Sequence, residues 1–184
     1  MKIQSHWKAF SILVMVLGAI WIALTFLLVP GQATALTAAP RPGFLAADFD
    51  LSTTAGSAVR LSSLSGKVVI LNFWASWCTP CQAEMPALQS VYEKYSDSGL
   101  VILAVNSTIQ DDPRSAEEFA LQKALTFPVL LDTSGAATRL YQVRALPTTF
   151  FIDQSGIIRE MAFGGPLSET YLLSQVESLL SGGR

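Results

Sequence analysis

The stretch KVVILNFWASWCTPC, residues 67–81, decides the fold of this 184-residue chain. Its first eight residues form an apolar run of strand length, as expected for a central strand that is covered on both faces. Two cysteines, Cys78 and Cys81, follow at the point where helix-forming residues begin. The stretch therefore predicts a buried strand, a turn and a helix that carries a cysteine pair at its start.

Strand and helix patterns alternate on both sides of this stretch. Residues 79–96 contain helix formers with apolar residues at three- and four-residue spacing, and Asp112-Pro113 is a typical helix start. Further strands are predicted at 49–51, 59–61, 100–105, 129–131, 148–152 and 157–163, and further helices at 136–141 and 166–180. This order predicts an α/β fold with helices on both faces of a sheet, and the closing hairpin makes the sheet mixed.

The N-terminal part has a different composition. Residues Ala9–Val29 are uncharged and apolar, and as a helix rising about 1.5 Å per residue they would span roughly 30 Å, the thickness of a bilayer core. Lys2 and Lys8 precede this run, and no basic residue follows before Arg41. The positive-inside rule then places residues 1–8 in the cytoplasm and the rest of the chain outside it. We expect one transmembrane anchor in a bacterial cell membrane, with a periplasmic or other extracytoplasmic domain.

A cleaved signal peptide is the alternative for this segment, because Ala33-Thr34-Ala35 resembles a cleavage site. Signal peptides have shorter apolar stretches of about 7–15 residues, which favours an uncleaved anchor. Residues 30–42 are rich in Ala, Thr, Gly and Pro and are interpreted as a linker. Residues 43–184 then form the functional domain.

The domain is acidic. From Arg41 onward there are ten Lys and Arg and fourteen Asp and Glu, which gives a net charge of −4. No run of basic residues is present, so nucleic acid is not expected as a partner.

The two cysteines are the whole cysteine content of the chain. A disulfide across two intervening residues constrains the unfolded chain little, so such a pair is typical of chemistry rather than stability. A helix N-terminus favours an anion, and we expect Cys78 to attack a disulfide as its thiolate. Cys81, one turn later, would resolve the mixed disulfide. No cofactor is expected beyond this redox-active pair.

Metal and haem binding fit the sequence poorly. Zinc needs three or four ligands, but there is no second cysteine pair, and the one histidine, His6, precedes the apolar run. Attachment of a c-type haem needs histidine directly after the second cysteine, where this chain has Gln82. No metal site is therefore expected.

A family resemblance rests on three separated features. NFWASWCTPC at residues 72–81, Glu84-Met-Pro86 and Leu146-Pro147-Thr148 together resemble the TlpA/ResA/CcmG-like thioredoxins. The resemblance covers about residues 43–182 and implies a thioredoxin-like domain tethered to a membrane. Many members reduce disulfides outside the cytoplasm, including those of apocytochromes c.

The resemblance also implies roles for particular residues. Pro147 would be a cis-proline that faces the disulfide, and the backbone of Leu146 would be the docking edge for a substrate strand. Thr79 and Pro80, between the cysteines, resemble the reductant members. The segment between Asn106 and Val143 is long enough for the extra strand–helix insert of this family.

Two residues near the motif carry separate predictions. Soluble thioredoxins have a buried aspartate where this chain has Asn72, which cannot titrate, while Glu84 lies one helical turn after Cys81. We hypothesise that Glu84 accepts or relays the Cys81 proton; the alternative is a solvated glutamate near a helix start. Trp77 is predicted to lie in the exposed rim beside Cys78, where an amphipathic ring suits client binding.

These observations predict an extracytoplasmic thiol–disulfide oxidoreductase that reduces client proteins. Its electrons would come from a membrane thiol reductant, because the cytosolic thioredoxin system cannot reach the site. A net oxidant or isomerase of secreted proteins is the alternative, which the redox potential would separate. A thiol peroxidase would show Pro and Thr ahead of a lone cysteine, a pattern that is missing. A copper-binding chaperone of similar fold would want a wider cysteine pair and a histidine in the domain.

Overall fold

The computed structural model describes residues 3–28 and 37–182. The chain divides into two units, Met1–Leu36 and Thr37–Arg184. In the first unit, α1 (Ile3–Leu28) is a single helix of 26 residues. Among the residues that the structure describes, we find no helix with the length and apolar character needed to cross a membrane.

Three of the predicted segments extend into residues outside the described ones. These are the cytoplasmic segment 1–8, the anchor 9–29 and the linker 30–42, which therefore stay predictions. The last linker residues that are described already pair with the domain: the Ala39 amide donates to the Leu45 carbonyl over 3.1 Å.

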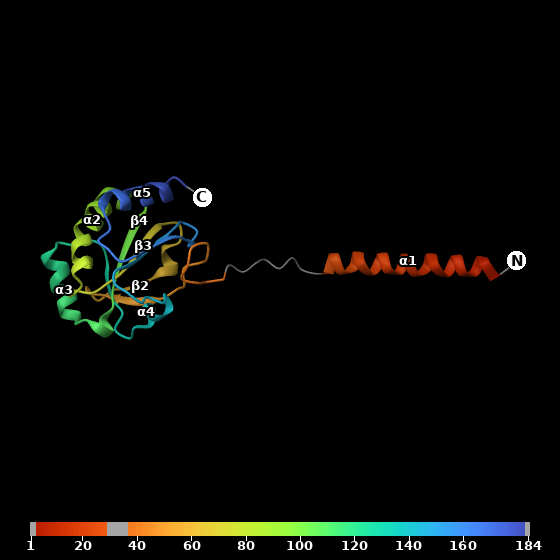
Figure 1. Ribbon diagram of the computed structural model, residues 1–184, viewed down its shortest axis with the longest axis horizontal. Helices are drawn as coiled ribbons and strands as arrows, with labels where there is room; N and C mark the ends of the chain where they lie inside the picture. The colour runs from red at the N-terminus through yellow and green to blue at the C-terminus, as the bar shows by residue number, and fades with distance from the viewer. Residues whose placement is uncertain (1–2, 29–36, 183–184) are drawn as a thin grey trace. The chain divides into compact units, whose positions relative to one another are not determined.

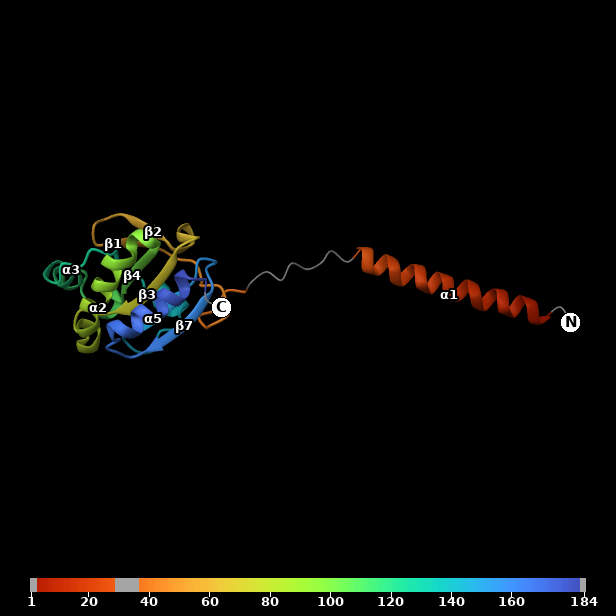
Figure 2. The same cartoon turned by 90° about the horizontal axis from the view of Figure 1, so that it is seen from above.

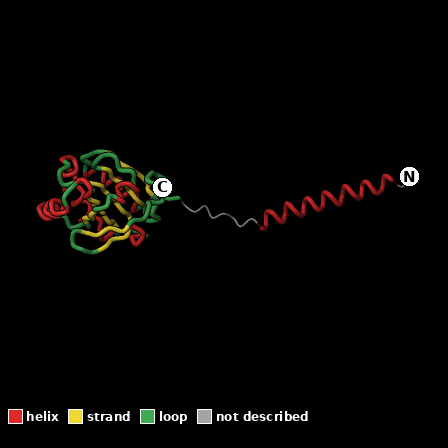
Figure 3. The backbone as a smooth tube through the Cα atoms, turned by 90° about the horizontal axis from the view of Figure 1, so that it is seen from below, coloured by secondary structure: helices red, strands yellow, loops and turns green. Residues whose placement is uncertain are grey.

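The second unit contains a seven-stranded mixed sheet, whose strands lie between the helices in Figure 3. Its strand order is β2-β1-β5-β4-β3-β6-β7. The central strand β3 (Val68–Trp74) runs parallel to β4 (Leu100–Asn106) and antiparallel to β6 (Thr148–Ile152). The other strands are β1 (Asp50–Thr53), β2 (Ala58–Arg60), β5 (Val129–Leu131) and β7 (Ile158–Phe163). All seven residues of β3 are buried, which confirms a central strand covered on both faces.

Helices cover both faces of this sheet, as predicted (Figures 1 and 2). On one face lie α2 (Thr79–Tyr95), α3 (Pro113–Gln122) and α5 (Glu169–Leu180), and on the other lies α4 (Ala136–Leu140). Three 3-10 helices, η1 (Leu61–Leu64), η2 (Ser96–Ser98) and η3 (Thr108–Gln110), occupy connections. Side chains of a strand alternate between faces, so β3 contributes to both apolar cores.

One predicted boundary was wrong and matters for the site. The last helix begins at Glu169 rather than at Pro166. Ser168 is the N-cap: its backbone is extended, and its hydroxyl accepts a hydrogen bond from the Tyr171 amide over 3.2 Å. Leu167 therefore lies in the loop before the helix, and its backbone amide has no partner within α5.

Candidate active site

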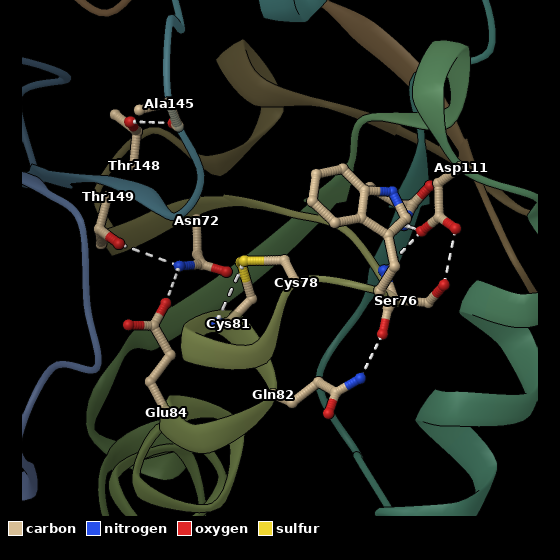
Figure 4. Close-up of a disulfide and its surroundings, with 12 residues drawn as sticks. Asn72, Ser76, Cys78, Cys81, Gln82, Glu84, Asp111, Ala145, Thr148 and Thr149 are labelled. Carbon is tan, nitrogen blue, oxygen red and sulfur yellow. Dashed lines mark hydrogen bonds between the residues drawn. A yellow bond between two sulfur atoms is a disulfide. The ribbon is translucent and has the colours of Figure 1, made fainter.

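Cys78 and Cys81 lie at the junction of β3 and α2. Cys78 is the N-cap of α2, with an extended backbone, and its sulfur accepts the Cys81 amide over 3.3 Å. The two cysteines form a disulfide with 5.2 Å between their Cα atoms (Figure 4). Thr79 and Pro80 form the first turn of the helix. The local sequence dictates this start, because proline is well tolerated in the first turn of a helix.

The two sulfurs differ in access. The side of the pair at Cys81 is closed, since Cys81 has no exposed surface, whereas Cys78 retains 4%. Around Cys78, Trp77 is 56% exposed, and Thr79 is also exposed. The exposed surface of the pair therefore lies at Cys78 rather than at Cys81, which fits the predicted order of nucleophile and resolving thiol.

The segment before Cys78 is fixed by a loop that follows β4. Asp111 accepts hydrogen bonds from the backbone amide and the hydroxyl of Ser76, over 2.5 and 2.6 Å. It also accepts one from the side-chain amide of Asn106 over 2.6 Å. The indole of Trp77 donates to the Gln110 carbonyl over 2.8 Å. Partial burial raises the pKa of Asp111, but these bonds outweigh it and hold the pKa below its ordinary value. Asp111 therefore stays ionised and keeps the approach to Cys78 in place.

Glu84 lies on the Cys81 side and has no exposed surface. One of its carboxylate oxygens accepts the Asn72 amide group over 2.7 Å, and the other accepts the backbone amide of Leu167 over 3.0 Å. Burial raises the pKa of Glu84, and the two hydrogen bonds offset only part of that rise. The alternative of a solvated glutamate is thus incompatible with the structure. A buried carboxyl with a raised pKa can exchange a proton closer to neutral pH than an exposed one.

Pro147 and Gly165 close the same side of the site. The Leu146–Pro147 peptide bond is cis, as the family resemblance implies. A Cβ atom added to Gly165 would lie 2.6 Å from a Glu84 carboxylate oxygen and 2.8 Å from Cγ of Pro147. Glycine is therefore needed there for close approach. Among the described residues, none bonds to the backbone amide or carbonyl of Leu146.

The predicted site residues gather at one end of the sheet. Those that the sequence singled out are Trp77, Cys78, Thr79, Pro80, Cys81, Glu84, Leu146 and Pro147. Sequence reasoning missed Asp111 and Gly165. The pair Asp111-Asp112 was a usable signal for the first, because Asp112 alone caps α3 and leaves its neighbour without a local role. No local signal marks Gly165, since its contacts are with residues distant in sequence.

Comparisons with known proteins give a consistent result. Residues 42–161 match the AhpC/TSA family. Thiol-disulfide oxidoreductase ResA of Geobacillus kaustophilus is 42% identical over 122 residues, which cover 66% of this chain and 69% of the relative. Thioredoxin-like protein YneN of Bacillus subtilis is 40% identical over 123 residues, covering 66% and 71%. The crystal structure of StoA from Bacillus subtilis superposes with a TM-score of 0.63 at 30% identity, covering 70% of this chain and 96% of that one.

Proposed function

Because this chain belongs to the AhpC/TSA family and is a thioredoxin-fold thiol–disulfide oxidoreductase, we propose that it reduces disulfides of client proteins outside the cytoplasm. The observation that carries thiol–disulfide exchange at Cys78 is its position as N-cap of α2, where its sulfur accepts a hydrogen bond from the backbone amide of Cys81. A helix N-terminus stabilises a thiolate, which is the attacking form in disulfide exchange.

The reaction proceeds in two exchanges. In the first, the Cys78 thiolate attacks a client disulfide, forms a mixed disulfide and releases one client thiolate. In the second, the Cys81 thiolate attacks the Cys78 sulfur, forms the Cys78–Cys81 disulfide and releases the second client thiolate. Two electrons pass to the client, and a membrane-bound dithiol restores the pair by the reverse exchange.

Glu84 is the group that we assign to the proton of Cys81. The second exchange needs a thiolate, so the Cys81 proton has to leave before attack. Glu84 is buried one turn further along α2, and burial raises its pKa toward the range where it can accept that proton. Replacing Glu84 with Gln should change the pH dependence of thiol exchange; unchanged profiles would remove Glu84 from the reaction.

The rim around Cys78 is the surface that we assign to client docking. Trp77 directly precedes Cys78, and Thr79 and Pro80 form the first turn of α2. Leu146 and Pro147 precede β6, and the unbonded backbone of Leu146 offers a donor and an acceptor to an extended client strand. Apocytochrome c, with its own cysteine pair, is the client class that we propose.

Residues 9–29 are the segment to which we assign membrane anchoring. Their length and lack of charge support this assignment, and Lys2 and Lys8 favour a cytoplasmic N-terminus. An anchor in this orientation would hold the domain beside a membrane dithiol donor.

The decisive experiment is a redox equilibrium of the full chain with glutathione buffers, read from tryptophan fluorescence. A midpoint potential near or below about −220 mV supports a reductant, on the scale where thioredoxin lies near −270 mV. A value toward about −120 mV would make the protein a net oxidant and would overturn the proposed direction.

A further inference from the structure

The side chain of Asn72 is fully buried on β3, yet only half of its amide is bonded. Its nitrogen donates to a Glu84 carboxylate oxygen over 2.7 Å and to the Thr149 hydroxyl over 2.9 Å. Its carbonyl oxygen has no hydrogen-bond partner among the described residues. A buried carbonyl oxygen without a donor is costly and rare, so it calls for an explanation.

The neighbours of Asn72 fix the direction of this oxygen. While Glu84 is ionised, its carboxylate only accepts hydrogen bonds, so the amide nitrogen of Asn72 faces Glu84, and both of its hydrogens are used by Glu84 and Thr149. The carbonyl oxygen then points the other way. Figure 4 shows it directed toward the sulfurs of the Cys78–Cys81 disulfide.

A disulfide has no hydrogen to donate, but a thiol does. When a donor dithiol reduces the pair, the S–S bond breaks, two electrons and two protons arrive, and the donor becomes a disulfide. One proton stays on Cys81, which is the more deeply buried of the two cysteines. The reduced cysteine pair therefore offers Asn72 a hydrogen-bond donor that the disulfide lacks.

We propose that Asn72 is the positioning residue of the resolving thiol, and that its carbonyl oxygen accepts a hydrogen bond from the Cys81 S–H group in the reduced protein. This inference rests on the proposed exchange at Cys78–Cys81. The hydrogen bond favours the dithiol over the disulfide and favours the protonated form of Cys81 over its thiolate. Asn72 thereby joins the thiol and Glu84 through opposite ends of one amide.

The titratable surroundings of Cys81 are few. On α2 they are Cys78 and Glu84, while β3, β4 and β6 carry no titratable side chain. Asp111 lies beyond Ser76 on the Cys78 side, and from α5 comes Tyr171, whose ring packs on Phe151. Cys78 and Glu84 are thus the groups whose titrations have to be separated from that of Cys81.

The test compares Asn72→Leu with the unchanged chain, using the full chain in detergent. The equilibrium with glutathione should shift roughly tenfold toward the disulfide, which corresponds to a potential about 30 mV lower. NMR titration of the reduced protein, labelled at cysteine Cβ, should give a lower pKa for Cys81. Introducing Asn72→Leu into Glu84→Gln removes the titration of Glu84 from the comparison. The shift of the glutathione equilibrium and the lower pKa of Cys81 should both persist there. The absence of both would overturn the inference.

The matched control is Thr138→Val, which removes a buried hydroxyl on the opposite face of the sheet. It should change the stability of the protein but neither the glutathione equilibrium nor the Cys81 titration. A shift as large as that of Asn72→Leu would mean that the loss of any buried polar group changes the glutathione equilibrium, and the inference would fail.

A second measurement does not depend on the folding of an Asn72 variant. In Cys78→Ala, Cys81 is the one thiol left, because the chain has two cysteines. Its infrared S–H band should lie at lower frequency than that of a simple alkyl thiol in an apolar solvent. A band at the free-thiol frequency would overturn the inference. If the unchanged chain exchanges with glutathione, a free-thiol band contradicts the hydrogen bond at Asn72 but leaves the proposed function intact. A redox-inert cysteine pair would contradict both the proposed function and this inference.

Discussion

On the Cys81 side of the disulfide a carboxyl group is fully buried, whereas on the Cys78 side the nearby carboxyl group is partly exposed. Glu84 accepts two hydrogen bonds, and burial dominates, so its pKa is raised. Asp111 accepts bonds from Ser76, Asn106 and the Asp112 amide, and its pKa is lowered although burial acts in the opposite direction. The pKa values of the two carboxyl groups that flank the disulfide are thus shifted in opposite directions.

This difference separates a group that can take part in proton transfer, Glu84, from a group that holds the local structure, Asp111. A carboxyl whose pKa is raised can gain and lose a proton under working conditions, as the resolving step requires. A carboxyl whose pKa is lowered stays charged and keeps its hydrogen bonds. The Cys81 side, which is closed, therefore suits proton exchange. The Cys78 side, which is open, suits a fixed surface for the client. Each prediction below would break or sharpen this contrast.

The largest effect is expected from exchanging the two cysteines for serine, one at a time. Cys81→Ser should accumulate a mixed disulfide with a disulfide-bonded peptide, because Cys78 still attacks but nothing resolves the product. Cys78→Ser should form none, since the remaining Cys81 has no exposed surface. Non-reducing electrophoresis measures both. Trapping by Cys78→Ser alone would reverse the two roles and with them the distinction between the open and closed sides.

Asp111→Asn should weaken the hydrogen bonds that hold the segment before Cys78 on the open side. The variant replaces an ionised acceptor of several hydrogen bonds, which should lower the free energy of unfolding by about 1.5–3 kcal/mol. Because the folded pKa of Asp111 is lowered, its contribution is present above the unfolded value of 3.8 and is lost as pH falls through the folded pKa. Denaturant titrations at several pH values measure this difference.

The control for this prediction is Asp112→Asn, since asparagine is also a good N-cap for α3. It should leave the free energy of unfolding nearly unchanged. A pH-independent loss in Asp111→Asn would show that packing, rather than charge, holds the segment before Cys78.

Gly165→Ala should disturb the closed side. The new methyl group would lie 2.6 Å from a Glu84 carboxylate oxygen and 2.8 Å from Cγ of Pro147, so neighbours have to move. Such overpacking lowers the free energy of unfolding by about 1–3 kcal/mol. The double variant with Glu84→Ala should lose less than the sum of the two single variants, because one obstacle is gone. Simple additivity would mean that Gly165 and Glu84 are not coupled.

The smallest effect is expected from the titration of Glu84 itself. Because its folded pKa is raised, Glu84 contributes stability that is fully present below the unfolded value of 4.5 and is lost as pH rises through the folded pKa. Each pKa unit of difference corresponds to about 1.4 kcal/mol. Glu84→Gln should lack this pH dependence in denaturant titrations of the oxidised protein, while the exposed substitution Glu118→Gln should retain it. A retained dependence in Glu84→Gln would assign it to another group.

Much of the fold could be predicted from local patterns. The apolar run before Trp74, the cysteine pair at a helix start and the Asp112-Pro113 cap each specify an element within a few residues. The start of α5 was misplaced by three residues, because Pro166 suits a first helical turn while Ser168 is the residue that caps it. Both are compatible with a helix start, so the sequence alone could not choose between them.

For the site, the sequence by itself determined the chemistry. Two thiols three residues apart at a helix N-terminus define a redox pair wherever the domain folds, because the helix carries both with it. What only the tertiary structure decided is the environment of that pair. Glu84 meets Asn72 and Leu167, and Asp111 meets Ser76, across 12 to 83 residues of chain. Burial and hydrogen bonds from distant segments set the direction of a pKa shift, and no local pattern encodes them.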